Sequence, residues 1–350
     1  MDINLFDYNL PEELIAQTPA HNRDESRLLI LDRKSGSTEI SSFQHIIDYI
    51  NPGDCLVVNN TKVFKARLLG NRATGGEVEV FLVRRKNDTL FWEALVQPSR
   101  RLNEGEEIFF HKSCHTDKLS LQLLKNKGEG KWEIQFHSKL SEEKIIERYG
   151  HVPLPQYIKR SDAPEDVSRY QTIFAKADKT GAVAAPTAGF HFTDSILEQL
   201  MAKNVNIAEL TLHVGPGTFK PVSVDDIRNH SVDPEYAVLN QKTADLINEA
   251  KKRGNKIIAV GTTSTRTLES AEVDKNGYIM PFEKFVDLYI QPGYKFKVVD
   301  HLITNFHLPK SSLLILVSAF AGREQIIEAY QKAIENKFCF YSYGDAMLIL

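Results

Sequence analysis

The spacing of apolar residues changes twice along the 350-residue chain and divides it into three regions. In the first, residues 1–60, the stretch RLLILDRKSGSTEI holds two extended runs around a Lys34-Ser35-Gly36 turn, which predicts a hairpin. A short helix and an apolar run from Cys55 to Val58 follow the hairpin. We expect this region to be the first segment of an α/β domain that resumes later in the chain.

The second region, residues 61–150, has the pattern of short strands separated by turns. The turn signals include Thr74-Gly75-Gly76, Lys86-Asn87-Asp88 and Gly128-Glu129-Gly130. Six short strands at regular spacing predict an antiparallel β-barrel, because a closed barrel leaves no strand edge exposed. The six extended segments are Val63–Leu69, Val78–Arg84, Leu90–Val96, Glu107–Phe110, Leu119–Leu124 and Trp132–Phe136.

Helices and strands alternate in the third region, residues 151–350. Apolar residues at helical spacing predict one helix around Ile196–Met201 and another around Leu246–Ala250, which ends in three basic residues and a Gly254 cap. The strand KIIAVG leads into a Thr/Ser-rich loop, TTSTRT, and a further helix. Near the end, the apolar run LLILV precedes a helix around Ile326–Ile334. This alternation predicts a largely parallel sheet covered by helices.

The predicted fold is therefore of the α/β class with two domains. Residues 1–60 and 151–350 form a discontinuous, layered α/β domain, and residues 61–150 form an inserted six-stranded antiparallel β-barrel domain. A chain of 350 residues is long enough for two such cores.

The composition, with 42% hydrophobic and 25% charged residues, is that of an ordinary globular protein. A net charge of −3 gives no general attraction for nucleic acid, so an RNA-binding surface would have to be a local basic patch. Basic residues gather around Lys62 and Arg67, among other places, and barrels often present one face to nucleic acid. Such a cluster is more often a plain solvated face.

The three cysteines lie far apart, which argues against a disulfide framework and a structural zinc site. His111 and His115 flank Cys114, but the helical HExxH pattern is absent, so we expect no metal. The acidic N-terminus lacks the features of a signal peptide, and the longest apolar run, Leu313–Val317, is too short to span a bilayer. We therefore expect a cytoplasmic protein that does not bind membranes.

Three stretches at the ends of predicted strands combine small residues with polar side chains, and ligands collect at such places in α/β sheets. GAVAAPTAGFHFTDS carries Thr187 and His191 before a helix, whose N-terminal amides suit an anionic group. GTTSTRTLES carries Thr263 and Arg266, which suit ribose or a carboxylate. TLHVGPGTF places His213 at a strand end as an acid/base candidate. Tight turns, helix capping and structural histidines explain the same residues equally well.

Several common motifs are missing. The GTTSTRT stretch lacks the Gly-Lys-Ser/Thr ending of a phosphate-binding Walker loop. A GxSxG nucleophile motif is absent, and so is GxGxxG after a strand. The second absence argues against a dehydrogenase and against a common Rossmann methyltransferase.

Eleven blocks of the chain resemble, in order, one known family: the S-adenosylmethionine:tRNA ribosyltransferase-isomerases of queuosine biosynthesis. The resemblance spans almost the whole chain. The blocks are DYNLPEELIAQTP, VVNNTKVFKARL, TGGEVEVFLVR, FWEALVQPSRRL, GHVPLPQYI, RYQTIFA, GAVAAPTAGFHF, TLHVGPGTF, AVGTTSTRTLES, LYIQPGYKFKVVDHLITNFHLPKSSLLILVSAFAG and YSYGDAML.

Some positions depart from the family pattern. Phe190 stands where Leu is common, Pro216 and Lys220 replace Ala and Gln, and Lys65 replaces Pro. Asp233 stands in place of a usual histidine, so we assign no catalytic histidine there. These departures concern the shape of local loops.

The resemblance implies an unusual use of S-adenosylmethionine as a co-substrate. The ribosyl part of the donor, rather than its methyl group, is transferred to 7-aminomethyl-7-deazaguanine at the wobble position of the tRNA anticodon loop. The group is isomerised to give epoxyqueuosine, and adenine and methionine are released. The resemblance implies no permanently bound cofactor and no metal.

Such a reaction needs a base for the C5′ proton, an acid that helps adenine leave, and polar groups for the methionine carboxylate. On this resemblance Arg266 is expected to bind the carboxylate, and the acid/base candidates stay unranked. The expected acid/base residues are His191, His213, His307 and Asp345; the expected substrate-binding residues are Thr187, Thr263, Arg266, Asn60 and Glu235; and the expected tRNA contacts are Lys62 and Arg67.

Two other functions remain open from the residues alone. An ordinary tRNA methyltransferase would release S-adenosylhomocysteine, whereas the ribosyltransferase releases adenine and methionine. A non-catalytic RNA-binding module would consume no donor, and it would leave the elaborate loops of the α/β domain without a purpose.

Overall fold

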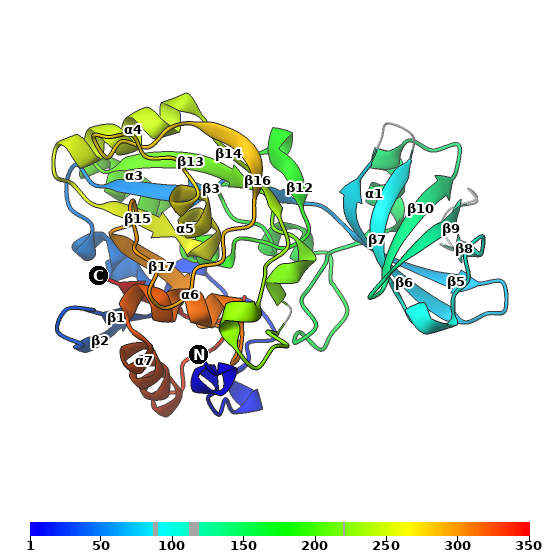
Figure 1. Cartoon of the computed structure of the whole chain (residues 1–350), viewed down its shortest axis with the longest axis horizontal. Coiled ribbons are helices and arrows are strands. Elements are labelled where there is room, and N and C mark those ends of the chain that lie inside the picture. The colour runs from blue at the N-terminus through cyan, green and yellow to red at the C-terminus, as the bar shows by residue number, and fades with distance from the viewer. Residues whose placement is uncertain (87–89, 112–118, 220) are drawn as a thin grey trace. The chain divides into compact units, whose positions relative to one another are not determined.

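The computed structural model divides into two compact units (Figure 1). The first comprises Met1–Lys62, Pro155–Arg160 and Ser168–Leu350, and the second comprises Val63–Leu154 and Ser161–Val167. The structure describes residues 1–86, 90–111, 119–219 and 221–350.

A nine-stranded sheet forms the centre of the first unit, in the order β16-β14-β13-β3-β15-β17-β18-β1-β2. The pairs β13–β3, β3–β15, β15–β17 and β18–β1 are parallel, and the remaining pairs are antiparallel. The predicted hairpin is confirmed as β1 and β2. The strands are β1 (Arg27–Leu31), β2 (Thr38–Ser42), β3 (Cys55–Asn59), β13 (Asn206–Leu212), β14 (Glu235–Leu239), β15 (Ile257–Val260), β16 (Phe282–Val286), β17 (His301–Asn305) and β18 (Ala346–Ile349).

Helices cover both faces of this sheet, so its inner strands are apolar on both sides. In β3, Cys55 and Val57 belong to one hydrophobic cluster, whereas Leu56 and Val58 belong to the other. This pattern is typical of a parallel strand buried between two helical layers, and the predicted layered α/β architecture is confirmed. The α-helices of the chain are α1 (Glu142–Tyr149), α2 (Asp166–Arg169), α3 (Asp194–Ala202), α4 (Gln241–Lys252), α5 (Gly261–Glu269), α6 (Ser312–Ala321) and α7 (Arg323–Glu335).

Short 3-10 helices and small strands complete the chain. Strand β4 (Lys62–Val63) lies where the chain leaves the first unit, and β12 (Thr180–Ala182) belongs to that unit. The 3-10 helices are Ile3–Phe6, Glu12–Leu14, Arg23–Glu25, Phe43–Tyr49, Ser99–Arg101, Ala177–Lys179, Thr187–His191, Pro216–Phe219 and Ile227–Asn229.

Two local predictions were wrong. The stretch TTSTRT is the beginning of helix α5 instead of a loop. It can be helical because the hydroxyls of Thr265 and Thr267 donate to the carbonyls of Gly261 and Thr263, four residues earlier, which satisfies these polar groups inside a buried helix. The run LLILV does not form a strand, because it lies within helix α6, whose buried residues pack in the core. An apolar run of this length does not distinguish a buried helix from a strand.

The second unit contains the predicted six-stranded antiparallel barrel, which is confirmed. Its strands follow the order β5-β6-β7-β10-β9-β8, and a further pairing of β5 with β8 closes the circle. Strand β11 (Gly150–His151) adds to β5 outside this ring. The first strand begins at Arg67 instead of Val63, and Asn87 and Asp88 of one predicted turn lie outside the described residues. The barrel strands are β5 (Arg67–Arg72), β6 (Glu77–Arg85), β7 (Phe91–Gln97), β8 (Glu107–Phe110), β9 (Leu119–Gly128) and β10 (Lys131–His137).

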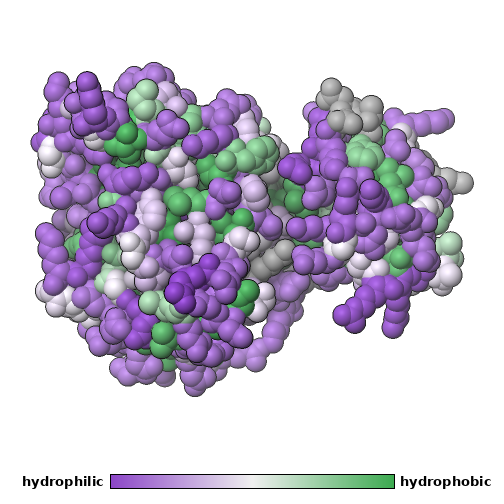
Figure 2. Space-filling view, viewed as in Figure 1, coloured by the Kyte–Doolittle hydropathy of each residue, from purple (hydrophilic) through white to green (hydrophobic). Residues whose placement is uncertain are grey.

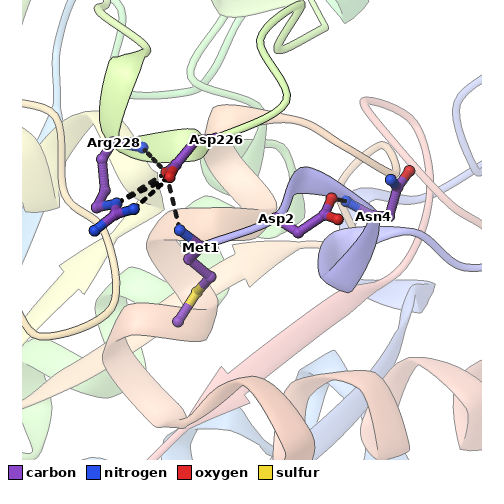
Figure 3. A network of polar contacts seen from close by, with 5 residues as sticks. All are labelled: Met1, Asp2, Asn4, Asp226 and Arg228. Atoms are coloured by element: carbon purple, nitrogen blue, oxygen red, sulfur yellow. Dashed lines mark hydrogen bonds and ion pairs between the residues drawn. The ribbon is translucent and has the colours of Figure 1, made fainter.

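The N-terminal segment anchors the connection between β13 and β14 (Figure 3). The Met1 ammonium group donates to the Asp226 carboxylate at 2.9 Å, and Arg228 donates to the same carboxylate. These hydrogen bonds hold the pKa of Asp226 well below its usual range. The Asp2 carboxylate accepts the Asn4 amide at 2.8 Å and so caps the first 3-10 helix. No helix among the described residues has the length and apolar character needed to cross a bilayer.

Candidate functional site

A pocket opens in the first unit where three strands of the sheet end. β13, β15 and β17 lead into Val214, Gly261 and Phe306, which all line it. Its free space, including the open mouth, is about 640 Å³. Ligands of α/β proteins bind at this end of the sheet, as predicted from the order of elements. The lining residues are Tyr157, Ala185, Pro186, Thr187, Ala188, Val214, Thr218, Gly261, Thr262, Thr263, Thr304, Asn305, Phe306, His307, Leu308, Ser311, Leu313, Tyr341 and Ser342.

The lining combines hydroxyl groups with apolar surface and carries no formal charge. Five threonines and two serines belong to it, and none of its described residues is Asp, Glu, Lys or Arg. The rings of Tyr157 and Tyr341 add an aromatic part, with ring centroids 4.7 Å apart. A few convergent polar groups beside aromatic surface are typical of a site for a small molecule.

Helix α5 begins in the wall of this pocket. Gly261 has a φ of +88°, which lets the chain turn from β15 directly into the helix. Thr262 and Thr263 belong to the first turn, where backbone N–H groups have no partner within the helix. The Thr263 hydroxyl is buried and has no hydrogen-bond partner among the described residues. The pocket therefore presents unused donors, which favour an anionic or oxygen-rich ligand group.

His307 is the only candidate histidine that lines the pocket within the described residues. Burial lowers its pKa to about 3, so the imidazole is neutral near pH 7. Its Nε2 lies 2.8 Å from the Thr304 hydroxyl, which itself donates to the Asn305 carbonyl. This arrangement assigns the proton to Nε2 and leaves a lone pair on Nδ1. Tyr8 and Tyr330 fix the backbone, since the Tyr8 hydroxyl donates to the His307 carbonyl and the His307 amide donates to the Tyr330 hydroxyl.

Thr187 reaches the pocket, and His191 lies behind it. The Thr187 hydroxyl donates to Asn305 Oδ1 at 3.1 Å, and Asn305 Nδ2 lies 3.2 Å from His191 Nε2. His191 Nδ1 in turn lies 2.7 Å from the Ser26 hydroxyl. Burial, and to a lesser degree the charge of Arg23, lower the pKa of His191 to about 3. His191 therefore supports the wall through hydrogen bonds and does not line the pocket.

Arg266 and Glu235 form a buried ion pair behind the pocket wall. Arg266 Nη1 donates to the Glu235 carboxylate, and Nε donates to the Leu288 carbonyl at 3.1 Å. The other Glu235 oxygen accepts the Gly215 amide at 2.7 Å and the Thr218 hydroxyl at 3.3 Å. Thr218 lines the pocket, whereas neither member of the pair does. Arg266, which we expected to bind the carboxylate of a ligand, thus binds the carboxylate of Glu235.

The other three acid/base and binding candidates lie away from the pocket lining. His213 Nδ1 is 2.8 Å from the Thr61 hydroxyl, and burial lowers its pKa. Asn60 accepts a hydrogen bond from Thr211 at 2.7 Å and is buried. Asp345 accepts backbone amides with both carboxylate oxygens, and burial raises its pKa. Asp345 therefore holds the backbone at Arg27 and Cys339 in place.

The predicted tRNA contacts belong to different units, Lys62 to the first and Arg67 to the second. Arg67 donates to Glu79 within the barrel at 2.8 Å. Cys114 and His115 lie outside the described residues. Among the residues that the structure describes, no group of three or more His, Cys, Asp or Glu side chains is arranged to hold a metal ion.

A family model described as "Queuosine biosynthesis protein" matches residues 3–349. The chain belongs to this family. The resemblance read from the sequence blocks is thus confirmed. The crystal structure of an S-adenosylmethionine tRNA ribosyltransferase from Thermotoga maritima is similar to this chain, with 34% sequence identity and a TM-score of 0.54. That match covers 99% of this chain and 100% of the other.

This member of the queuosine biosynthesis family has pocket residues that our sequence hypothesis left out. Thr218, Thr262, Asn305, Tyr341 and Ser342 line the pocket but were not among the candidates. All five lie in or beside the blocks that carry the family resemblance. The blocks were therefore a usable signal, but only the fold tells which side chain of a block faces the pocket.

Two departures from the family pattern lie close to the pocket rim. Pro216 begins the 3-10 helix that carries Thr218. A Cβ atom added to Gly217 would lie 2.7 Å from an Asp233 carboxylate oxygen, so Asp233 packs closely against this helix. The departures at residues 216 and 233 thus concern one turn of the chain.

Proposed function

We propose that the protein transfers the ribosyl moiety of S-adenosylmethionine to 7-aminomethyl-7-deazaguanine at the wobble position of tRNA and isomerises it. Epoxyqueuosine forms, and adenine and methionine leave. Membership of the queuosine biosynthesis family supports this reaction, and the likeness to the Thermotoga maritima enzyme supports the donor and the tRNA acceptor. The observation in this chain that carries the proposal is the uncharged, hydroxyl-rich pocket at the start of α5.

In this proposal the start of α5 binds the methionine carboxylate of the donor. The first-turn amides and the partnerless Thr263 hydroxyl are suited to donate to its oxygens. This assignment replaces Arg266, because Arg266 Nη1 binds Glu235 and Arg266 does not line the pocket. Arg266 and Glu235 then act on the site by holding the Gly215–Thr218 turn.

His307 is the acid/base group of the proposed site. The sulfonium of the donor acidifies the C5′ protons, and the Nδ1 lone pair of a neutral imidazole can accept one of them. A pKa of about 3 makes the imidazole a weak base in the empty pocket. A carboxylate bound in the same pocket raises that pKa, because an anion stabilises the protonated ring. His191, His213 and Asp345 rank below His307 because none of the three lines the pocket.

The aromatic part of the pocket is suited to the adenine ring and the sulfonium of the donor. Tyr341 has a φ of +72°, a conformation that bulky side chains rarely adopt. Its backbone is held there, since its amide donates to the Phe306 carbonyl and its carbonyl accepts from Asn305. Strained residues of this kind concentrate at functional sites. We assign the Tyr341 ring to stacking with adenine, and a flat aromatic face also attracts a cation.

One incubation tests the proposed reaction. The protein is mixed with S-adenosylmethionine labelled in its ribose and with tRNA that carries the aminomethyl base. We expect label in the tRNA, with one adenine and one methionine released for each transfer. Release of S-adenosylhomocysteine would instead identify a methyltransferase, and no donor consumption would identify a binding module.

A further inference from the structure

A row of three aromatic rings crosses one edge of the first unit's sheet. Tyr236 of β14 is paired directly opposite Phe285 of β16, and the His213 amide donates to the Tyr236 carbonyl at 3.0 Å. The His213 and Tyr236 rings are stacked with centroids 5.8 Å apart, and the Tyr236 and Phe285 rings meet edge to face at 5.6 Å. Directly opposed residues share one face of an antiparallel sheet, so the three rings form one surface.

This aromatic row (His213, Tyr236 and Phe285) reaches solvent. Phe285 is 53% exposed, and β16 is the edge strand of the sheet (Figure 1). The surface of the molecule is mostly hydrophilic in the view of Figure 2, and Phe285 is the one aromatic residue among the exposed large hydrophobic side chains of the described residues. Glu283 fixes the orientation of Tyr236 by accepting its hydroxyl.

Positive charge lies beside the His213 end of the row. The Thr61 hydroxyl contacts both the His213 ring and the Lys179 carbonyl, and the Lys179 charge contributes to the lowered pKa of His213. Lys62 follows Thr61 directly in the chain. The row therefore runs from the charge of Lys179 toward an exposed phenylalanine.

The aromatic row and the candidate pocket share one segment of chain. His213 belongs to the row, and the next residue, Val214, lines the pocket. The row and the pocket wall are thus joined through two consecutive residues of the chain.

We propose that the aromatic row is a stacking surface for unpaired bases of an RNA loop, with Lys62 and Lys179 meeting the adjoining phosphates. This inference rests on the proposed function, since it concerns how that acceptor is held. Proteins recognise single-stranded RNA loops by stacking splayed bases on exposed aromatic rings, and a planar ring accepts any base. Lysines beside such rings neutralise the phosphates between stacked bases.

The test uses equilibrium binding of tRNA to the full-length protein at one fixed salt concentration. Phe285→Ala removes the exposed ring, and we expect the tRNA dissociation constant to rise about tenfold. Phe285→Trp restores a flat ring and should restore affinity, whereas Phe285→Leu keeps an apolar side chain without a ring and should not. Met201→Ala, at a position equally exposed on α3, is the matched control and should bind tRNA normally.

Measurements of donor binding distinguish base stacking by Phe285 from a general structural role. The dissociation constant for S-adenosylmethionine and the melting temperature should stay unchanged in the Phe285 variants, while the KM for tRNA rises with the dissociation constant. Normal tRNA affinity in Phe285→Leu would overturn base stacking. A changed oligomeric state in Phe285→Ala would overturn it too, by identifying the row as a protein contact. If the wild-type protein binds tRNA through the row but releases no adenine, the proposed function fails and this inference stands.

Discussion

The buried guanidinium of Arg266 on α5 donates to the carboxylate of Glu235 on β14, and each of the two residues is less than a tenth exposed. Glu235 also holds the Gly215 amide and the Thr218 hydroxyl, so the pair connects the middle of α5 to the pocket rim. Removing one partner of such a buried pair strongly destabilises the folded protein, because the other charge is left uncompensated.

Arg266→Ala should therefore lower the free energy of unfolding by about 3–5 kcal/mol, as measured by urea denaturation. The double variant Glu235→Leu, Arg266→Met should recover most of that loss, because it buries no unpaired charge. The donor KM of the double variant tests whether Arg266 binds the donor carboxylate directly. A donor KM near the wild-type value would exclude direct binding, because the guanidinium is absent from that variant.

Thr263→Val should weaken donor binding without destabilising the protein. Valine has nearly the shape of threonine, and the Thr263 hydroxyl that it removes is buried without a partner. If that hydroxyl binds the donor, the dissociation constant for S-adenosylmethionine should rise about tenfold by calorimetry, with the melting temperature of the free protein unchanged or higher.

The matched control is Thr265→Val on the same helix, where the hydroxyl donates to the Gly261 carbonyl instead of facing the pocket. We expect normal donor affinity in this control. Equal donor affinities in the two variants would remove Thr263 from the binding site.

Stability should fall as the pH drops below about 6.5. His191 and His307 have pKa values of about 3 in the folded protein, against about 6.5 in an unfolded chain. Between these values the unfolded chain binds protons that the folded protein does not, so the stabilisation is complete above pH 6.5 and is lost toward pH 3. Each histidine contributes a slope of up to about 1.4 kcal/mol per pH unit.

Urea midpoints between pH 5 and pH 7 measure this slope before most carboxylates titrate. His191→Gln should reduce the slope by the contribution of one histidine, since glutamine does not titrate. A slope that is the same in the variant and in the wild type would show that His191 is not held neutral.

The large elements of the fold were predictable because each has its own periodic signal. The alternation in residues 61–150 predicted the barrel, and the Lys34-Ser35-Gly36 turn predicted the first hairpin. TTSTRT was misassigned because its hydroxyls suggested a loop, although Thr265 and Thr267 satisfy them within α5. The local composition of a segment does not determine which group accepts a hydrogen bond from each hydroxyl.

The sequence predicted the position of the pocket, but only some of the residues that line it. Its position follows from the ends of β13, β15 and β17, and Thr187, Thr263 and His307 were among the candidates. The partner of Arg266 could not be predicted, because Glu235 lies 31 residues away and only the pairing of sheet and helix brings the two together. Asp345 was an acid/base candidate because it is a carboxylate in a block of the family resemblance, but its oxygens bind backbone amides.

Binding of tRNA should weaken with salt, and Lys62 should contribute more to this effect than Arg67. Each phosphate contact releases counterions, so the logarithm of the association constant falls linearly with the logarithm of salt concentration. Arg67 is already paired with Glu79, whereas Lys62 belongs to β4, which pairs with β12 directly after Lys179. Lys62→Gln should reduce the slope by about one unit, and Arg67→Gln by less. A salt-independent affinity would argue against phosphate contacts by either residue.

Asn305 connects the pocket to His191, and Asn305→Asp tests that connection. In the wild type, Asn305 Nδ2 faces both His191 Nε2 and the Tyr341 carbonyl, which assigns the imidazole proton to Nδ1, next to Ser26. An aspartate oxygen in place of Nδ2 would face two acceptors, and protonation of Nε2 is the change that relieves the repulsion from His191. The pKa of His191 should therefore rise from about 3, because the new carboxylate stabilises the imidazolium.

Nitrogen NMR of the labelled imidazole follows this titration directly. The Tyr341 carbonyl would still face an unpaired oxygen in Asn305→Asp, so the strained Tyr341 backbone should relax and its ring should move. We expect the donor KM to rise about tenfold, while the Thr187 hydroxyl keeps its acceptor on the other aspartate oxygen. If the His191 pKa rises but the donor KM is unchanged, Asn305 has only a structural role. Tyr341 would then not contribute to donor binding.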